Sequence, residues 1–477
     1  MRHRRLWKKP NYGALIKGCG CMQLRKYLIK NFVLPVISRK MLKWLNFYEK
    51  SQWWRPAKLR ALQENKLRKM MNYVYNNVPY YRKVFKHKNL RPEDIKNTED
   101  LEKIPVLSHE DVRQNAVDLI SVDKSIGSLL RCQTTGTTGH PLVLYKDKNE
   151  LGSGIACLFR GWGWCGYQIG DKRALVWGRR LVTSKYASMK ANLLNSLKRT
   201  ILLGAWNLGE EKIEYFVKRL NAAKPTFLSG YVSPINLLAN FINQKGVDLD
   251  FNLKGISTTA EPLLGFHRRE IEKAFRCEVF DQYGSGEVNS LGFECEEHMG
   301  LHVPIERVHI EFLDEEDDSP VSVGEKGRIV VTCLENYGMP LIRYDTEDLG
   351  VGREGSCSCG RKLPLMDSII GRRIDLIRLP NGNVIYGGLF AIALQDLEWT
   401  TKYGLTQFQL VQKKLDYIVL KIQTQKKPSQ QALKLFKGLM KEHLGDVALD
   451  IDIVDQIPVL AFDKRRYIIS EVNRQSS

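Results

Sequence analysis

A short run of hydroxyl and glycine residues, Thr134-Thr135-Gly136-Thr137-Thr138-Gly139, is the first part of the chain whose residue types suit a chemical task. Threonine hydroxyls donate hydrogen bonds, and glycines allow backbone N–H groups to turn inward around a ligand. Such a loop suits the phosphates of a nucleotide. It lacks the Gly-x4-Gly-Lys-[Ser/Thr] spacing of a P-loop, so the mechanics of P-loop enzymes do not apply to it. The alternative is a Thr/Gly hairpin that joins two strands and binds nothing.

Two later segments offer carboxylates. In the first, Tyr283 supplies an aromatic face next to Gly284, and Glu287 supplies a carboxylate that could bind Mg²⁺. The second, residues 341–350, contains Asp348, an acid that could accept hydrogen bonds from the hydroxyls of a ribose. Taken singly, each segment is weak evidence, because Tyr-Gly-Ser-Gly-Glu can be any turn.

Basic residues complete the set. Gly371-Arg372 precedes the last hundred residues, and Lys464 lies in a basic run near the C-terminus. An exposed basic turn is the alternative interpretation of Lys464. The order and separation of these segments, rather than any one of them, favour a nucleotide site.

In this order the chain resembles the adenylate-forming superfamily, which includes acyl-CoA synthetases, amino-acid adenylation domains and luciferases. It looks most like the phenylacetate–coenzyme A ligase family, in the branch of capsular-polysaccharide proteins called CapK. The superfamily's phosphate loop reads roughly Thr-Ser-Gly-Thr-Thr-Gly-x-Pro, and its counterpart here is Thr134 to Pro141. The family's Tyr-Gly-x-x-Glu matches Tyr283 to Glu287, and its Arg-Tyr-x-Thr-x-Asp-Leu matches Arg343 to Leu349. The likeness runs from about residue 50 to residue 472.

The resemblance implies ATP as a reactant, Mg²⁺ as a cofactor and coenzyme A as the acceptor. It implies adenine contact for Tyr283, magnesium for Glu287, ribose contact for Asp348, a hinge at Gly371-Arg372 and an adenylation lysine at Lys464. The expected catalytic residues are Lys464, Glu287 and Thr137. The expected nucleotide-binding residues are Thr134, Thr135, Gly136, Thr137, Thr138, Gly139, Tyr283, Gly284, Glu287, Asp348 and Arg372.

Three positions depart from the family pattern. The usual glycine before the ribose acid is Glu347, and Ile374, followed by Asp375, stands where many relatives have a pivot aspartate. The C-terminal Gly-Lys of the family is Asp463-Lys464 here.

The substrate pocket is expected at two segments that resemble pocket-forming segments of the family. Its expected residues are Tyr231, Ser233, Thr259, Ala260 and Glu261. The resemblance implies a small-molecule carboxylate as substrate and does not identify the acyl group.

A structural metal site is a separate expectation. Cys357 and Cys359 form a Cys-x-Cys knuckle, and Cys295 lies some sixty residues earlier with two histidines. Together these could complete a tetrahedral zinc site, with His302 favoured and His298 the competing ligand. Family members show a similar pattern, which implies such a site. The alternative is buried free cysteines and surface histidines.

The elements that must position these residues alternate between helix and strand, which predicts an α/β fold with βαβ units and a parallel sheet covered on both faces. Expected strands are 226–230, 255–259 and 277–281, and expected helices are 56–86, 213–220, 234–243 and 265–275. The end of the chain reads as helix 389–400, strands 406–413 and 415–423, helix 429–442 and strand 447–454, a small α+β domain of split βαβ type. The expected divisions are a basic segment (1–50), a large adenylate-forming domain (51–370), a hinge (371–375) and a small mobile domain (376–477).

Charge is concentrated at the N-terminus. Residues 1–85 hold 21 Lys and Arg against two acids, a net of +19 out of +20, which leaves +1 for the other 392 residues. This distribution argues against a nucleic-acid-binding cleft and favours a basic attachment surface at one end. Residues 24–48, which Pro35 interrupts, could lie on an anionic membrane, and the alternative is a helix packed on its own domain. Neither a transmembrane helix nor a secretory signal is expected, so the predicted location is the cytoplasm, with the inner face of the membrane as an open alternative.

Three functions remain in view. The first is ATP-dependent adenylation of a carboxylate, with transfer to coenzyme A, in cell-surface polysaccharide biosynthesis. The second is adenylylation of a hydroxyl acceptor, with AMP kept on the product. The third is a scaffold for polysaccharide synthesis at the membrane, without catalysis. The sequence does not indicate an oligomeric state.

Overall fold

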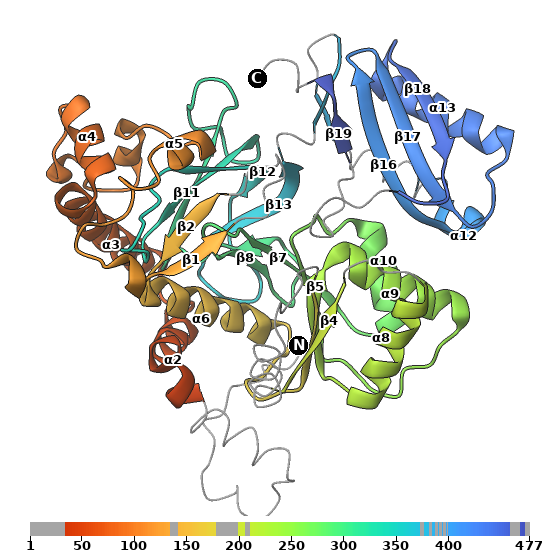
Figure 1. Cartoon of the computed structure of the whole chain (residues 1–477), viewed down its shortest axis with the longest axis horizontal. Helices are drawn as coiled ribbons and strands as arrows, with labels where there is room; N and C mark the ends of the chain where they lie inside the picture. The colour runs from red at the N-terminus through yellow and green to blue at the C-terminus, as the bar shows by residue number, and fades with distance from the viewer. Residues whose placement is uncertain are drawn as a thin grey trace, which may run out of the picture.

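The computed structural model describes residues 34–133, 142–177, 199–205, 210–372, 376–380, 384–386, 390, 394, 397, 399–457 and 468–472. They form a large domain followed by a small C-terminal domain at one corner of the molecule (Figure 1). Helices and strands alternate through the middle of the chain, and the predicted α/β class is confirmed.

The large domain is built on a sheet of eleven strands in the order β10-β11-β12-β13-β9-β8-β7-β6-β5-β3-β4. The strands from β4 to β7 are parallel, as predicted. They are β3 (Arg173–Trp177), β4 (Thr200–Gly204), β5 (Phe227–Tyr231), β6 (Ile256–Thr259) and β7 (Val279–Gly284). The helices that connect them are α8 (Glu210–Ala223), α9 (Val232–Lys245) and α10 (Gly265–Phe275).

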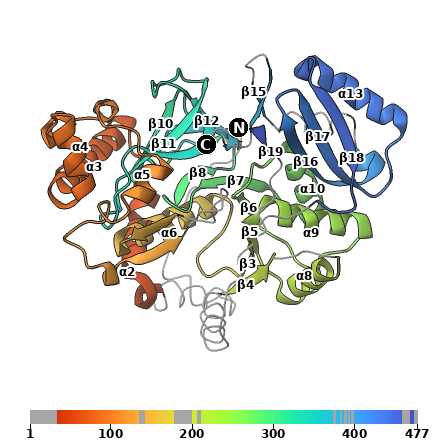
Figure 2. The same cartoon turned by 45° about the horizontal axis from the view of Figure 1, so that its top comes forward.

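Both faces of this parallel half are covered, because successive strand residues point to opposite faces of the sheet. Leu228 and Val279 join a core formed with α8, α9 and α10. Their neighbours Phe227 and Phe280 join a second core that contains Trp162, at the end of α6 (Lys148–Trp164). Figure 2 shows α8, α9 and α10 on one side of these strands and α6 on the other.

The other half of the sheet is antiparallel, which the prediction of a parallel sheet did not include. Its connections are turns and loops without a crossover helix, and antiparallel pairing is the arrangement that such connections allow. The strands are β8 (Ser290–Glu294), β9 (Leu301–His302), β10 (Val308–Leu313), β11 (Lys326–Cys333), β12 (Tyr344–Arg353) and β13 (Leu365–Arg372).

Helices near the N-terminus pack beside this antiparallel half. The helical region predicted over 56–86 divides at Val78, because Pro79 ends α3 and also begins α4. Ser108 caps α5 through a hydrogen bond from the Asp111 N–H to its hydroxyl. The elements are α3 (Pro56–Asn77), α4 (Pro79–His87), α5 (His109–Gln114) and three 3₁₀ turns, η2 (Pro92–Asp94), η3 (Glu99–Lys103) and η4 (Ile126–Ser128).

The helix α2 (Leu34–Ser51) packs on α6 of the large domain. Met41, Leu45 and Tyr48 are buried, and the Tyr48 hydroxyl lies 2.6 Å from that of Ser153 on α6. Pro35 therefore lies in the first turn of a helix and does not interrupt it, and the packing alternative holds for this part of the segment. Within the part of the chain that the structure describes, none of the helices has the length and apolarity needed to cross a membrane.

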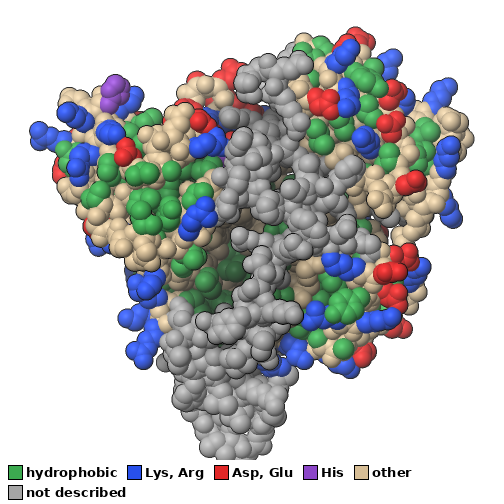
Figure 3. All heavy atoms as spheres, viewed as in Figure 1, with side chains coloured by type: hydrophobic (Ala, Val, Ile, Leu, Met, Phe, Trp, Pro, Cys, Tyr) green, Lys and Arg blue, Asp and Glu red, His purple; other side chains and the backbone are tan. Residues whose placement is uncertain are grey.

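Basic side chains gather on the outer surface of α2, α3 and α4, along one edge of the molecule (Figure 3). Those exposed to solvent are Arg39, Lys40, Lys43, Lys50, Lys58, Arg60, Arg68, Lys69, Arg82, Lys83 and Lys86. Most of the basic charge in this part of the chain is therefore solvated.

The small domain has a four-stranded sheet in the order β18-β17-β16-β19, with β16 and β17 antiparallel and the outer strands parallel to their neighbours. The strand β19 and the pair β14–β15 were not predicted. Phe266 and Leu264 of the large domain pack against the core of the small domain. The elements are β14 (Leu376–Arg378), β15 (Val384–Tyr386), α12 (Trp399–Tyr403), β16 (Leu405–Lys414), β17 (Tyr417–Thr424), α13 (Gln430–Leu444), β18 (Ala448–Ile453) and β19 (Ile468–Ser470).

Candidate nucleotide site and metal cluster

Tyr283 and Asp348, predicted to hold adenine and ribose, meet in the structure. The Tyr283 hydroxyl lies 2.8 Å from Oδ2 of Asp348 and 3.3 Å from the hydroxyl of Thr346. Thr346 donates in turn to the Ile329 carbonyl at 2.8 Å and accepts from the Asp348 N–H at 3.2 Å. Burial, followed by the charges of Asp348 and Glu287, raises the pKa of Tyr283 well above its usual value. The phenol therefore stays protonated and donates to the acid.

The position of Arg372 follows from the pairing of β12 with β13. Asp348 and Arg372 are directly opposite one another across these strands. The side chain of Arg372 lies outside the described atoms, as do residues 373–375 of the predicted hinge, which include Ile374 and Asp375. The backbone register alone places the predicted Gly-Arg beside the predicted ribose acid.

The backbone conformation of Glu347 bears on one departure from the family pattern, the replacement of a glycine by this glutamate. Its φ of 61° is in the left-handed region, where glycine is favoured. The glycine that the family has at this position thus corresponds to a real backbone requirement, and the glutamate adopts the same conformation at an energetic cost. Its carboxylate lies 3.4 Å from His109, and its N–H donates to Asp345.

Glu287, the predicted magnesium ligand, lies in the turn between β7 and β8 and is partly exposed. Gly284 ends β7 and is paired with Ser290 on β8. The charge of Glu287 contributes, after burial and the charge of Asp348, to the raised pKa of Tyr283. A single carboxylate suits Mg²⁺ that also binds substrate phosphates and water.

The predicted phosphate loop, residues 134–141, lies outside the described residues, and so do Asp463 and Lys464. Nothing in the structure places Thr134, Thr135, Gly136, Thr137, Thr138 or Gly139. The flanking strands β1 (Leu130–Gln133) and β2 (Val143–Lys146) are described, and Gln133 pairs with Val143 in an antiparallel hairpin.

The predicted pocket residues lie at the carboxyl ends of two adjacent parallel strands, the edge at which α/β sheets bind ligands. Tyr231 ends β5 and pairs with Thr259, which ends β6. Glu261 accepts hydrogen bonds from the N–H of Ser233 at 2.6 Å and from its hydroxyl at 2.5 Å, at the start of α9. Ala260, between Thr259 and Glu261 in the sequence, has a φ of 70° and is exposed. All five predicted positions therefore occupy one end of the sheet.

The four predicted zinc ligands come together in the antiparallel half. Their ligand atoms lie within 4.8 Å of one another, and all but the partly exposed Cys359 are buried. Sγ of Cys295 is 3.5 Å from Sγ of Cys357, and Nε2 of His302 is 3.3 Å from Cys295 and 3.4 Å from Cys359. The edges of a tetrahedron with 2.3 Å Zn–S bonds are about 3.8 Å, so small outward shifts would accommodate the ion.

The chemistry of this group also fits zinc. Three cysteine sulfurs and one imidazole nitrogen form the Cys₃His donor set that structural zinc sites use. His298 is not in the group, because its Nδ1 lies 3.1 Å from Glu294 and 3.2 Å from Arg268.

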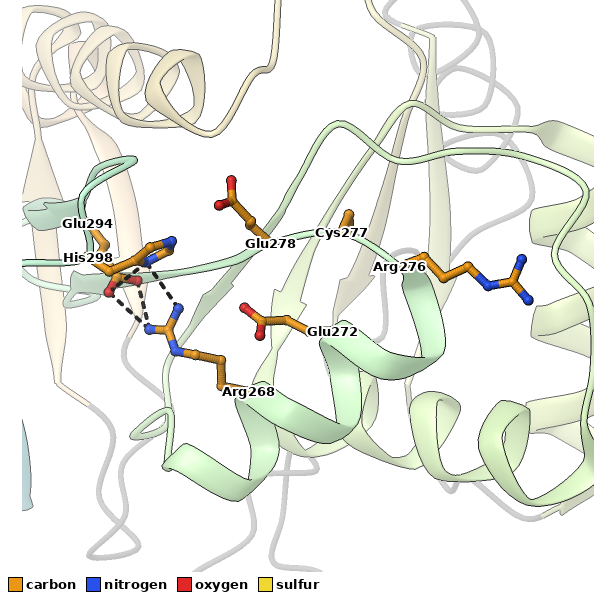
Figure 4. Close-up of a pocket in the computed structure, with 7 residues that line it drawn as sticks. All are labelled: Arg268, Glu272, Arg276, Cys277, Glu278, Glu294 and His298. Carbon is orange, nitrogen blue, oxygen red and sulfur yellow. Dashed lines mark hydrogen bonds and ion pairs between the residues drawn. The ribbon is translucent and has the colours of Figure 1, made fainter. Parts of the chain in front are cut away.

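A cavity of about 640 Å³ is lined by charged residues of both signs and by none of the four cluster residues. In Figure 4, Arg268 points to Glu294 and His298, while Glu272 and Glu278 lie farther along the wall. The guanidinium of Arg268 is occupied by both oxygens of Glu294, at 3.0 and 2.9 Å. Glu278 directly precedes β7, so the cavity is near the amino end of that strand, whereas the predicted nucleotide residues are near its carboxyl end.

Two residues that the structure places beside the predicted site were not predicted. Thr346 lies within the Arg343–Leu349 motif, where the family pattern has a threonine, so the motif itself contained the signal. Lys146 is buried at the end of β2 and binds the turn that carries Glu287. No sequence pattern marks a buried lysine.

Comparison with known proteins agrees with this architecture. A family model described as the CapK C-terminal domain matches residues 380–471. Protein CapK of Staphylococcus aureus is 25% identical over 86% of this chain and 89% of its own length. A phenylacetate-coenzyme A ligase of Thermus thermophilus is 27% identical over 83% of this chain and 86% of its own.

Among solved structures, 2-hydroxyisobutyryl-CoA ligase in its postadenylation state superposes with a TM-score of 0.69 at 20% identity, covering 89% of this chain and 93% of that one. The two-domain fold is that of this CoA ligase. In sequence, the chain is similar to phenylacetate-coenzyme A ligases and to protein CapK, and its residues 380–471 match the CapK C-terminal domain.

Proposed function

We propose that the protein uses ATP and Mg²⁺ to adenylate a small carboxylic acid and then transfers the acyl group to coenzyme A. The observation that carries the proposal is the hydrogen bond between Tyr283 and Asp348, which joins two motifs that are 65 residues apart. A carboxylate has room for several donors, so Asp348 can accept ribose hydroxyls as well as the phenol. The ring of Tyr283 then lies beside the adenine.

In the proposed reaction, a carboxylate oxygen of the acid attacks the α-phosphorus of ATP. A bond forms between them, the bond to the β-phosphate oxygen breaks, and pyrophosphate leaves with the electron pair. Because both partners are anions, the protein must supply positive charge and N–H donors, and it must fix the two in line. We assign these tasks to the loop 134–139, with Thr137 among its donors, and to Lys464.

Glu287 is the residue proposed to hold Mg²⁺, which would neutralise charge on the phosphate oxygens when bound. Tyr231, Ser233, Thr259, Ala260 and Glu261 are proposed to line the acid pocket. The support is their common position at the carboxyl ends of β5 and β6. The residues Cys295, His302, Cys357 and Cys359 are proposed to hold a structural zinc ion, supported by the closeness of their ligand atoms.

A role in cell-surface polysaccharide synthesis is the finer part of the proposal. It rests on the similarity to protein CapK and on the match of residues 380–471 to the CapK C-terminal domain. The basic surface of α2 to α4 supports a cytoplasmic enzyme that contacts an anionic membrane face, since clustered Lys and Arg are attracted to anionic lipids. Vesicle co-sedimentation with and without phosphatidylglycerol tests this contact.

The test of the activity is ATP–pyrophosphate exchange with a panel of carboxylic acids. Exchange that depends on one class of acid supports the proposal. The Glu287→Gln variant should then lose most of the exchange while remaining folded, and Glu316→Gln, at an exposed site, serves as the control. A folded protein that does not bind MgATP favours the scaffold alternative. Mass spectrometry showing AMP retained on the product favours a hydroxyl acceptor.

A further inference from the structure

Lys146 is a buried lysine beside the candidate nucleotide site. Only 2% of its surface is exposed, and it ends β2, the strand that leaves the loop 134–141. Its Nζ donates to the Gly286 carbonyl at 2.9 Å and to Oδ1 of Asn289 at 3.1 Å. Both acceptors belong to the connection from β7 to β8, in which Glu287 lies between them.

Within the described part of the chain, both hydrogen-bond acceptors of the ammonium are uncharged. Among the salt bridges of the described residues, none includes Lys146, and the neighbouring loop 134–141 contains no Asp or Glu in its sequence. Burying a charge without an opposite charge is costly, so such an ammonium is stabilised when an anion binds nearby. A nucleotide polyphosphate is an anion of this kind, and the segment that precedes β2 in the chain is the predicted phosphate loop.

The far side of the same connection is braced by a second set of buried contacts. Nδ2 of Asn289 donates to Glu150 at 3.1 Å, and both oxygens of Glu150 lie 2.7 Å from Arg307. Arg307 also donates to the Ser290 carbonyl at 2.8 Å. With Asn289 and Ser290 fixed in this way, Lys146 is the contact that fixes the Gly286 carbonyl, next to Glu287.

We propose that Lys146 is a positioning residue for the ligase reaction. It holds the turn that carries Glu287 at a fixed place relative to the strand that leaves the phosphate loop, and its positive charge favours a Mg²⁺-bound polyphosphate over a nucleotide with one phosphate. This inference rests on the proposed function, because it assigns Lys146 to the same nucleotide site. It differs from a purely structural role, which would weaken the binding of every nucleotide equally.

The test compares two probes by calorimetry, MgATP and AMP in EDTA. The variants are Lys146→Met, which removes the charge, and Lys146→Arg, which keeps charge and donors. Lys172→Met is the matched control, because the Lys172 ammonium also donates to a backbone carbonyl, that of Ala223, in the parallel half. We expect Lys146→Met to weaken MgATP at least tenfold and AMP less than threefold, while Lys146→Arg and Lys172→Met stay within threefold of the wild type for both probes.

Three outcomes are informative. Equal losses for MgATP and AMP in a folded Lys146→Met protein, or no loss for either, would overturn the assignment. If Lys146→Met does not fold by circular dichroism, Lys146→Gln replaces it under the same criteria. A wild-type protein that binds neither probe overturns the proposed function itself, so the two failures are told apart by the wild-type measurement.

Discussion

Tyr283 on β7 and Asp348 on β12 are linked through a 2.8 Å hydrogen bond, although β7 belongs to the parallel half of the sheet and β12 to the antiparallel half. The bond therefore connects the two halves of the large domain at the candidate nucleotide site. Thr346 supports it from the same strand as Asp348. A change at either end should affect nucleotide binding before it affects the rest of the fold.

The first prediction concerns the acid of this pair. Asp348→Asn should weaken MgATP binding by roughly tenfold to a hundredfold, because hydrogen bonds to a charged group contribute about 1.5–3 kcal/mol each. Calorimetry on the folded variant measures the loss. Tyr283→Phe keeps the ring and should have a smaller effect. Unchanged affinity in Asp348→Asn would remove this acid from the site.

A second prediction follows from the backbone at Glu347. Its left-handed φ of 61° costs a residue with a side chain about 1 kcal/mol relative to glycine. The partly exposed contact with His109, at 3.4 Å, offsets a fraction of this strain energy. Glu347→Gly should therefore raise the free energy of unfolding by about 0.5–1 kcal/mol. Glu347→Ala loses the contact and keeps the strain, so urea denaturation should find it less stable than the wild type.

A third prediction concerns the metal cluster. Purified protein should contain about one zinc ion per chain by elemental analysis, the occupancy of a single four-ligand site. Removal of the ion by a chelator should lower the unfolding temperature, because binding energy at a structural site is folding energy. Cys359→Ser should lose the metal. Cys277→Ser, outside the cluster, should keep it, and a zinc-free wild type with the same stability would contradict the assignment.

A fourth prediction uses pH. His267 is 2% exposed, and burial lowers its pKa to about 3. In the unfolded chain this histidine has an ordinary pKa near 6.5, so below about pH 6.5 it is protonated there while it stays neutral in the folded protein. The contribution of His267 to the free energy of unfolding is therefore fully present above about pH 6.5. It falls by up to about 1.4 kcal/mol per pH unit as the pH drops toward 3. Urea denaturation of the wild type and of His267→Leu between pH 4.5 and 8 should give a stability difference that shifts in favour of the variant at low pH. A constant difference would contradict the buried neutral state.

The strands β5, β6 and β7 and the helices α8, α9 and α10 were predictable because strand and helix alternate along this part of the chain, and the spacing of apolar residues changes from one to the other. The helix α10 has the predicted bounds, and α8 and α9 each extend the predicted helix at both ends. The antiparallel half was not predicted, since β10 to β13 are joined by turns and loops, and their pairing depends on contacts between strands that the sequence does not mark. The same holds for β19, which pairs with β16 over a separation of some sixty residues.

At the candidate site, the residues that lie in recognisable sequence motifs were the easiest to predict. Tyr283, Asp348 and the group of three cysteines with His302 were identified from motifs, and the structure brings each set together. Lys146 was not predicted because lysines are usually exposed, and its burial depends on packing that the sequence does not indicate. Residues of the phosphate loop and Lys464 lie outside the described part of the chain, so their roles stay predictions.

The pairing of Asp348 with Arg372 has a mechanical consequence. Arg372 is the last residue of β13, and the small domain begins only a few residues later. The connection to the small domain thus starts at Arg372, which is paired across neighbouring strands with Asp348, the acid proposed to bind the ribose. If the predicted hinge at 371–375 lets the small domain rotate, the rotation would be centred close to Asp348, and the strands farthest from the hinge would move the most.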